Sequence, residues 1–206
     1  MYLRILTRSV PLALIAVLAS CAPTVTPPSK TTTTKNTTTT PTPTSTDLAG
    51  HPLNPFTPSP NTKATLLLFI TDTCPISNGY APDIRRLAEA YAPHGIAFYL
   101  VYADPDLSQA DAQKHYHDYA YPCPALLDPK RDLVRRAGAT VTPEAAVFTP
   151  SGQRIYLGRI DDRAVAYAKS RTTVTTHDLQ DVLESLVHDR PVTPHTTKAV
   201  GCPIPE

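Results

Sequence analysis

The sequence predicts an α/β domain built on a mixed sheet with flanking helices, and three observations support that prediction. Two continuous apolar runs, at residues 64–71 and 95–104, have the length and character of strands buried on both faces. A helical pattern follows each run, which is the alternation typical of a parallel α/β sheet. Residues 144–160 then form two apolar stretches joined at Ser151-Gly152, a hairpin signal that makes the last strands antiparallel.

The elements of the first half follow from apolar spacing and capping residues. A helix is expected from Ser77 to Tyr91, because apolar side chains recur at helical spacing with charged side chains opposite them. After the second strand, Ser108 is a typical N-cap, and the polar helix that it opens is expected to run to about Tyr119. Residues 123–128 are long enough for a short third strand.

The second half adds two helices and a tail. Residues 129–137 are expected to form a helix that ends at Gly138, a residue type that favours the left-handed cap conformation. Residues 177–188 carry an amphipathic pattern and are expected to close the fold as a helix. The proline-rich tail from Asp189 to Glu206 is expected to be irregular.

The N-terminal segment has the build of an export signal. Two arginines precede a short apolar run, and small residues then lead to Cys21. The apolar run is shorter than the ~20 residues of a membrane span. The stretch LASC at residues 18–21 resembles the lipobox of bacterial lipoproteins, whose cysteine is acylated and becomes the mature N-terminus. An ordinary secretory signal with a chance cysteine is the alternative.

Composition divides the chain into three segments. Residues 1–20 are expected to be a lipoprotein signal peptide, residues 21–52 a disordered tether rich in threonine and proline, and residues 53–206 the folded domain. The formal net charge of +1 gives no reason to expect a nucleic-acid partner. We therefore expect a protein of the bacterial cell envelope, periplasmic or surface-exposed, that is attached to a membrane through a lipid on Cys21.

One cysteine stands where thiol chemistry is favoured. Cys74 follows the first buried strand and directly precedes Pro75 at the start of a helix. Sites in α/β sheets form at the C-terminal ends of parallel strands, and the N–H groups of a helix start lower the pKa of a thiol. The alternative is a buried cysteine that packs as a small apolar side chain, but the polar residues 71–73 do not look like a core.

The motif TDTCPIS at residues 71–77, the motif VTPEAAVF at residues 141–148 and the order of elements resemble the thioredoxin superfamily. Within it, the chain is most similar to the redoxin branch of alkyl hydroperoxide reductase and thiol-specific antioxidant proteins, over residues 53–188. The resemblance implies a thioredoxin-like three-layer fold, with a mixed central sheet and flanking helices. It also implies a cis-proline at Pro143 facing Cys74; a trans proline opening an edge strand is the alternative.

The position of the usual second cysteine is the first departure from this family pattern. Ser77 stands where a Cys-x-x-Cys site has that cysteine. Its hydroxyl can cap the helix or bond to a thiolate, but it cannot resolve a mixed disulfide. Copper-delivery relatives have a second cysteine where Asn78 stands here, and a distal histidine that is not found beside Pro143.

The peroxiredoxin motif is also incomplete. Thr71 fits the threonine of that motif, but Leu67 stands where the motif has proline. Peroxiredoxins hold the peroxide with an arginine as well. Arg159 and Arg163 are candidates for that role through their proximity to the last strand and nothing more.

The remaining cysteines supply candidate partners for Cys74. If Cys21 is acylated, the odd number Cys74, Cys123 and Cys202 leaves one disulfide and one free thiol, or an intermolecular bond. Cys202 is the preferred resolving cysteine, because a mobile tail can approach and withdraw during exchange. Cys123 is the alternative resolving cysteine, and a static Cys74–Cys202 disulfide that staples the tail is the inert alternative.

These residues predict an extracytoplasmic thiol-dependent oxidoreductase. Cys74 attacks a peroxide or a protein disulfide, and Cys202, Cys123 or an external thiol resolves the product. Thr71 and Ser77 are expected near the reacting sulfur, and Pro143 is expected to shape the opposite wall. The regenerating reductant is expected to be a thiol.

Two other classes of function stay open. The domain could be a binding module that holds copper or docks onto a membrane assembly without turnover, or a structural domain with an inert disulfide. No cofactor is implied and no metal site is assigned. His115 and His117 are two residues apart on a predicted helix, so they form a poor metal pair.

Overall fold

The structure, a computed structural model, describes residues 45–57 and 59–205. The expected signal peptide at residues 1–20, the expected acylation site Cys21 and most of the expected tether lie outside the described residues. Within the part of the chain that is described, none of the helices combines the length and apolar character needed to cross a membrane.

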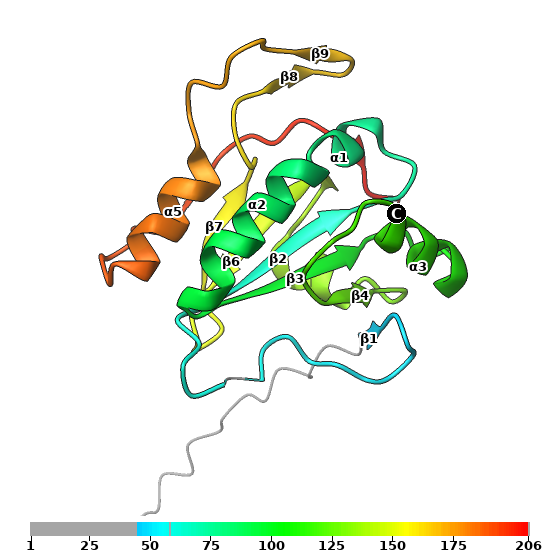
Figure 1. The fold of residues 1–206 in the computed structure, drawn as a ribbon, viewed down its shortest axis with the longest axis horizontal. Helices are drawn as coiled ribbons and strands as arrows, with labels where there is room; N and C mark the ends of the chain where they lie inside the picture. Colours follow the sequence, from blue (N-terminus) through cyan, green and yellow to red (C-terminus); the bar gives the residue numbers. More distant parts are fainter. Residues whose placement is uncertain (1–44, 58, 206) are drawn as a thin grey trace, which may run out of the picture. The chain divides into compact units, whose positions relative to one another are not determined.

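A seven-stranded mixed sheet lies at the centre of the domain, with the strand order β1-β4-β3-β2-β6-β7-β10 (Figure 1). Its parallel part consists of β2 (Ala64–Ile70), β3 (Ile96–Tyr102) and β4 (Ala125–Leu127). β6 (Glu144–Phe148) runs antiparallel to β2 and continues through the predicted hairpin into β7 (Arg154–Gly158). The α/β class, the mixed sheet and the three apolar strands are therefore confirmed.

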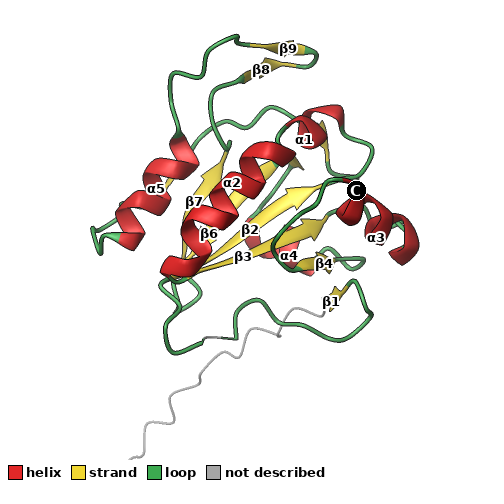
Figure 2. Ribbon diagram, in the orientation of Figure 1, coloured by secondary structure: helices red, strands yellow, loops and turns green. Residues whose placement is uncertain are grey.

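The helices cover both faces of the sheet (Figure 2). α2 (Ala81–Tyr91) and α5 (Asp178–Val187) pack over one face, together with the apolar side of α3 (Gln109–Asp118). α4 (Asp132–Ala137) packs on the other face. The helices on one face, the sheet, and α4 on the other face form the three layers.

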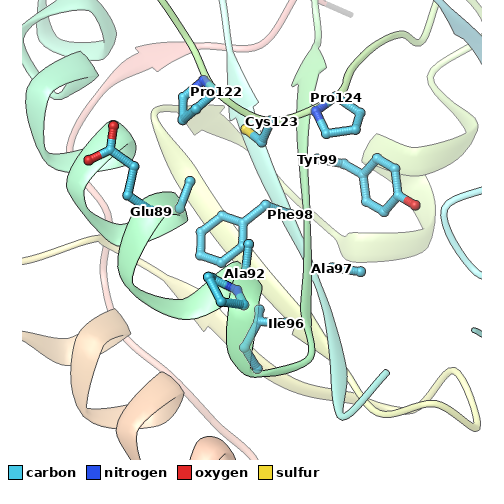
Figure 3. A pocket seen from close by; sticks show the side chains of 11 residues that line it. Glu89, Ala92, Ile96, Ala97, Phe98, Tyr99, Pro122, Cys123 and Pro124 are labelled. Carbon is cyan, nitrogen blue, oxygen red and sulfur yellow. The ribbon is translucent and has the colours of Figure 1, made fainter. Parts of the chain in front are cut away.

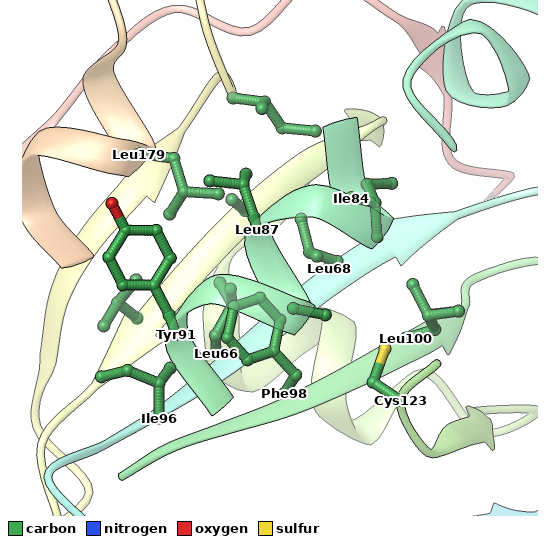
Figure 4. Close-up of a cluster of buried hydrophobic side chains, with 14 of the residues drawn as sticks. Leu66, Leu68, Ile84, Leu87, Tyr91, Ile96, Phe98, Leu100, Cys123 and Leu179 are labelled. Carbon is green, nitrogen blue, oxygen red and sulfur yellow. The ribbon is translucent and has the colours of Figure 1, made fainter. Parts of the chain in front are cut away.

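The continuous apolar run of β2 is explained by this burial on both faces. All seven of its residues are buried, and successive side chains point to opposite faces. Leu66 and Leu68 join the larger cluster with α2 and α5, which Figure 4 shows, whereas Leu67 and Phe69 join the smaller cluster with α4. Leu67 is thus a core residue at the position where the peroxiredoxin motif has proline.

The single helix predicted from Ser77 to Tyr91 is divided in two. α1 (Pro75–Gly79) begins two residues earlier than predicted, and α2 begins at Ala81. Tyr80 lies between them as the cap of both. Pro82 explains the division, because it has no N–H to donate and its ring would clash with the carbonyl four residues earlier if one helix continued.

Capping residues set the bounds of α3 and α4. Ser108 is the N-cap of α3, and its hydroxyl accepts the N–H of Asp111 at 3.1 Å, as predicted. α4 begins at Asp132 rather than at Pro129, because the buried carboxylate of Asp128 accepts three successive backbone N–H groups there, those of residues 132–134. Gly138 ends α4 with φ +73°, the left-handed cap that was predicted.

The prediction of an irregular tail is wrong for two short segments, while the rest of the described tail carries no helix or strand. β10 (His195–Thr196) adds to the sheet parallel to β7, and β11 (Cys202–Pro203) pairs antiparallel with β5 (Val141–Thr142). The tail, red in Figure 1, therefore runs from α5 back to the loop that contains Pro143. Prolines restrict where the tail can donate hydrogen bonds, but they leave two-residue strands available at an edge.

Other short elements also went unpredicted. β8 (Ala164–Ala166) and β9 (Lys169–Ser170) form a separate small hairpin between β7 and α5. A 3₁₀ turn, η1 (Ala92–His94), follows α2. β1 (Thr46–Asp47) pairs with β4, so the sheet includes residues that composition had assigned to the tether.

Candidate redox site

Cys74 lies at the junction between β2 and α1, as the N-cap of α1. Its backbone is extended, with φ −81° and ψ 111°, and its sulfur accepts the N–H of Ser77 at 3.4 Å. Pro75 occupies the first turn, where a missing N–H costs no helical hydrogen bond. The residue is only 1% exposed, so the sulfur is held by local backbone geometry in a nearly closed environment.

A disulfide joins Cys74 to Cys202. The two Cα atoms are 5.9 Å apart, a usual separation for a disulfide. Cys202 lies in β11 directly opposite Thr142 of β5, so the strand pairing and the disulfide hold the same residue. Cys202 is partly exposed, in contrast to Cys74.

The loop before β6 forms the wall that faces Cys74. The Thr142–Pro143 peptide bond is cis, as the family resemblance implied. The carbonyl oxygen of Thr142 is 3.1 Å from the Cys74 sulfur. Because a disulfide sulfur carries no hydrogen, this contact becomes a hydrogen bond only when Cys74 is a free thiol.

Thr71 lies close to this wall, and within the described residues no hydrogen bond joins it to the Cys74 sulfur. Its buried hydroxyl is 3.2 Å from the hydroxyl of Thr142 and shares a hydrogen bond with it. The structure thus brings Thr71, Cys74, Cys202 and the Pro143 loop together. In the oxidised state, Thr71 acts on the loop and not on the reacting atoms.

Ser77 is fully buried one turn after Cys74. Its backbone N–H contacts the Cys74 sulfur, but its hydroxyl has no hydrogen-bond partner among the described residues. A buried hydroxyl without a partner costs free energy. The Ser77 hydroxyl is therefore an unused donor on the first turn of α1, the helix that Cys74 caps, when the disulfide is formed.

Noncovalent contacts also hold the tail at the site. The N–H of Ile204 donates to the carbonyl of Thr140 at 3.0 Å, and the Ile204 side chain packs into the cluster under α4. The guanidinium of Arg131 donates to the carbonyl of Pro205 at 2.6 Å. These contacts anchor the tail on the far side of Cys202 from β10, so the tail is attached on both sides of the disulfide.

A buried hydrogen-bond chain behind α1 was not found from the sequence. His115 Nδ1 is 2.9 Å from the Tyr102 hydroxyl, and His115 Nε2 is 2.9 Å from Asn78 Oδ1. Asn78 Nδ2 in turn donates to the carbonyl of Asp72 at 2.7 Å. The chain thereby links β3 and α3 to both sides of Cys74. The signal available was the spacing of His115 with Ala112, which places both on the apolar side of α3.

The free thiol of Cys123 belongs to a different environment. It is 4% exposed and lies on the wall of a pocket of about 450 Å³ between α2, η1 and β3 (Figure 3). Burial raises the pKa of its thiol to about 12. A thiol that stays protonated at neutral pH is a poor nucleophile, and the disulfide partner of Cys74 in the structure is Cys202.

The two candidate arginines are engaged elsewhere. Arg159 pairs with Asp178 at 2.8 Å. Arg163 pairs with Asp83 at 2.5 Å and lies over the ring of Tyr80, 4.1 Å from its centroid. Within the described residues, neither arginine bonds to the disulfide or to Thr71. Arg163 does line a second pocket of about 350 Å³ beside α1, whose wall includes Tyr167, an aromatic residue that is 71% exposed.

Potential metal ligands do not cluster in the described part of the chain. No group of three or more histidine, cysteine, aspartate or glutamate side chains lies in metal-binding proximity there. His115 uses both ring nitrogens in the chain behind α1, and His117 is exposed on the other side of the helix.

Comparison with solved structures supports the assignment of fold. An uncharacterized conserved protein from Geobacillus kaustophilus is 24% identical with a TM-score of 0.68, covering 78% of this chain and 86% of that chain. A hypothetical protein from Sinorhizobium meliloti 1021 is 22% identical with a TM-score of 0.65, covering 77% and 87%. The thioredoxin domain of a thiol-disulfide oxidoreductase from Bacteroides vulgatus is 18% identical with a TM-score of 0.50, covering 70% and 91%. At these identities the similarity shows the thioredoxin-like fold.

Sequence comparison gives the family. No curated protein is significantly similar to this chain. The Redoxin family model matches residues 23–181, which is more than half of the chain and includes Cys74 and Pro143, whereas Cys202 lies beyond the matched residues. The chain belongs to the Redoxin family.

Proposed function

We propose that the domain is a thiol–disulfide oxidoreductase in which Cys74 and Cys202 alternate between dithiol and disulfide. The observation that carries the proposal is the Cys74–Cys202 bond itself. It joins a sulfur at a helix start, opposite a cis-proline, to a terminal strand of two residues. Such a strand can separate from β5 without disturbing the central sheet, so the bond can open and close within the folded protein.

The catalytic cycle transfers two electrons. The Cys74 thiolate attacks a disulfide of a substrate protein, a Cys74–substrate disulfide forms, and one substrate thiolate leaves. The Cys202 thiolate then attacks the Cys74 sulfur, which forms the bond seen in the structure and releases the second substrate thiolate. A dithiol reductant returns the pair to the reduced state and becomes a disulfide itself.

Protein disulfides fit the site better than peroxides. A peroxide site requires polar donors that stabilise the leaving hydroxide, and Arg159 and Arg163 are committed to Asp178 and Asp83. The hydroxyl of Thr71 is committed to Thr142. Pro143 and the β5 backbone, by contrast, already bind an extended segment with a cysteine, namely the tail.

The test is a redox titration of the full chain with a matched activity assay. The protein is equilibrated in glutathione buffers of graded ratio and quenched with acid, and the Cys74–Cys202 bond is quantified by peptide mass spectrometry. Reduction of insulin disulfides by dithiothreitol is measured in parallel for the wild type, Cys74→Ser and Cys202→Ser. We expect reversible titration in the folded state and loss of turnover in both variants. A bond that opens only when the domain unfolds would show that the disulfide is an inert staple.

We further propose that the domain works outside the cytoplasm on a lipid anchor. The support is the export-signal pattern of residues 1–20, the lipobox-like cysteine at position 21 and the threonine- and proline-rich residues that follow. Fractionation of cells that express the wild type or Cys21→Ser tests this proposal. We expect the wild type in the membrane fraction and the variant released; equal fractionation of the two would contradict a lipid anchor.

A further inference from the structure

The two sulfurs of the disulfide differ in how a reductant can reach them. Cys74 is 1% exposed, and the two residues with a polar atom at hydrogen-bond distance from its sulfur, Ser77 and Thr142, are fully buried. Cys202 is partly exposed, and the residue after it, Pro203, is exposed. β11 is also the outer strand of its two-stranded sheet, so its far edge is not covered by another strand of the described chain. Solvent therefore reaches the tail side of the bond.

The space around the two sulfurs strengthens this difference. A thiolate displaces a sulfur by approaching along the line of the bond that breaks, from the side opposite the leaving sulfur. Ser77 N lies 3.4 Å and the Thr142 carbonyl oxygen 3.1 Å from the Cys74 sulfur, so part of the space around this sulfur is already occupied. Cys202 is the more exposed of the two residues. Crowding and burial therefore favour attack on the same sulfur, that of Cys202.

The leaving group also favours attack on Cys202. If Cys202 is attacked, Cys74 departs as a thiolate that already accepts the N–H of Ser77. The Ser77 hydroxyl, which has no partner in the disulfide state, lies on the same first turn, and we expect it to donate to the departing thiolate. Once protonated, the Cys74 thiol can donate to the Thr142 carbonyl. A good leaving thiolate speeds exchange.

We propose that the regenerating thiol enters through Cys202, so that the reductant and the substrate protein meet different sulfurs. This step rests on the proposed function. The reductant thiolate bonds to the Cys202 sulfur, the Cys74–Cys202 bond breaks, and Cys74 leaves with the electron pair. A second thiolate of the reductant then attacks its own sulfur in the mixed disulfide, which releases the Cys202 thiolate and an oxidised reductant.

The anchors of the tail keep this step local. The contacts of Ile204 and the Arg131–Pro205 contact involve no sulfur, so opening the disulfide breaks neither of them directly. Cys202 with its adduct is therefore expected to stay tethered near the site, even when β11 separates from β5. The Redoxin family model ends at residue 181, so this entry point lies in a part of the chain that the model does not cover.

The experiment identifies which sulfur carries the adduct. The oxidised full chain is mixed with excess glutathione, which has one thiol and cannot complete the second step intramolecularly. The reaction is quenched with acid after short times, free thiols are alkylated under denaturing conditions, and peptides are quantified by mass spectrometry. We expect glutathione on Cys202 at least tenfold more often than on Cys74, with Cys74 alkylated. Equal amounts or a preference for Cys74 would overturn the proposal.

A rate measurement covers the case in which the adduct is too short-lived to quantify. Ser77→Ala removes a donor from the departing Cys74, so we expect the second-order rate of reduction by glutathione to fall severalfold. Ser185→Ala, at a half-buried position on α5, is the matched control and should leave the rate unchanged. An unchanged rate in Ser77→Ala would contradict the leaving-group argument for attack on Cys202. Failure of the proposed function is distinct, because the folded wild type would then resist reduction altogether.

Discussion

The backbone of Gly201 lies directly against the carbonyl oxygen of Thr142, with no room for a side chain between them. A methyl group at Gly201 would overlap that oxygen and push β11 away from β5. Overpacking of this kind typically costs 1–3 kcal/mol. For Gly201→Ala we therefore expect the equilibrium constant for forming the Cys74–Cys202 bond to fall about tenfold, since about 1.4 kcal/mol corresponds to that factor.

The measurement is the fraction of disulfide in glutathione buffers of graded ratio. Gly79→Ala is the matched control, because a methyl group there would meet no atom within 4 Å. Gly79 is also the last residue of α1, close to the same site. Equal titration curves for Gly201→Ala and Gly79→Ala would show that close pairing of β11 does not set the strength of the bond.

The stability of the domain should depend on Cys202. The disulfide joins residues separated by 128 positions, and a cross-link over so long a loop restricts the unfolded chain strongly. We expect Cys202→Ser to lower the free energy of unfolding by about 2–5 kcal/mol under oxidising conditions. Urea denaturation measures the loss. The variant and the reduced wild type should be nearly equally stable; a large remaining difference would assign the loss to the side chain rather than the bond.

The free energy of unfolding should depend on pH through the protonation of His115. Burial lowers its pKa, and the nearby carboxylates of Asp72 and Asp118 offset this effect in part. As the pH falls below about 6.5, the unfolded chain takes up a proton that folded His115 resists, so stability decreases until the lowered pKa of the folded state is passed. Above about 6.5 this contribution is constant.

Denaturation curves at several pH values between 5 and 8, conditions chosen to span that window, test the assignment. His115→Gln should flatten the acidic decrease, while His117→Gln, at an exposed position on the same helix, should retain it. If His115→Gln loses as much stability at acidic pH as the wild type does, another group causes the decrease.

Cys123 should take no part in the redox cycle. Its burial and its pKa, raised to about 12, keep it a protonated thiol at neutral pH. We expect Cys123→Ala to leave the glutathione titration of Cys74–Cys202 unchanged, and iodoacetamide to label Cys123 of the wild type only after unfolding. Rapid labelling in the folded state, or an altered titration, would make Cys123 a candidate resolving cysteine for Cys74.

The sequence was informative wherever one element carries enough residues to show a period. The seven apolar residues of β2, the N-cap at Ser108 and the left-handed glycine at Gly138 each follow from local chemistry that tertiary contacts do not override. Cys74 was found for the same reason, since its placement between strand and helix is a local feature.

The remaining features depend on contacts between distant residues. β10 and β11 have two residues each, too few to show alternation, and exist because they meet β7 and β5. The division at Tyr80 had a local signal in Pro82 that the helical period concealed. The roles of His115 and Asn78 depend on α3 lying behind α1, which spacing along one helix does not reveal.

The outer strands of the central sheet also bear on solubility. β1 and β10 form its two edges, and both are short strands from segments at either end of the described chain. Short strands of this kind shield the longer strands from pairing with other molecules. A protease that cuts after α5 would free β10 from the edge of β7, and the tail with Cys202 would be lost once the disulfide to Cys74 is reduced. A cut that ends the redox cycle would thus also expose a strand edge that favours aggregation.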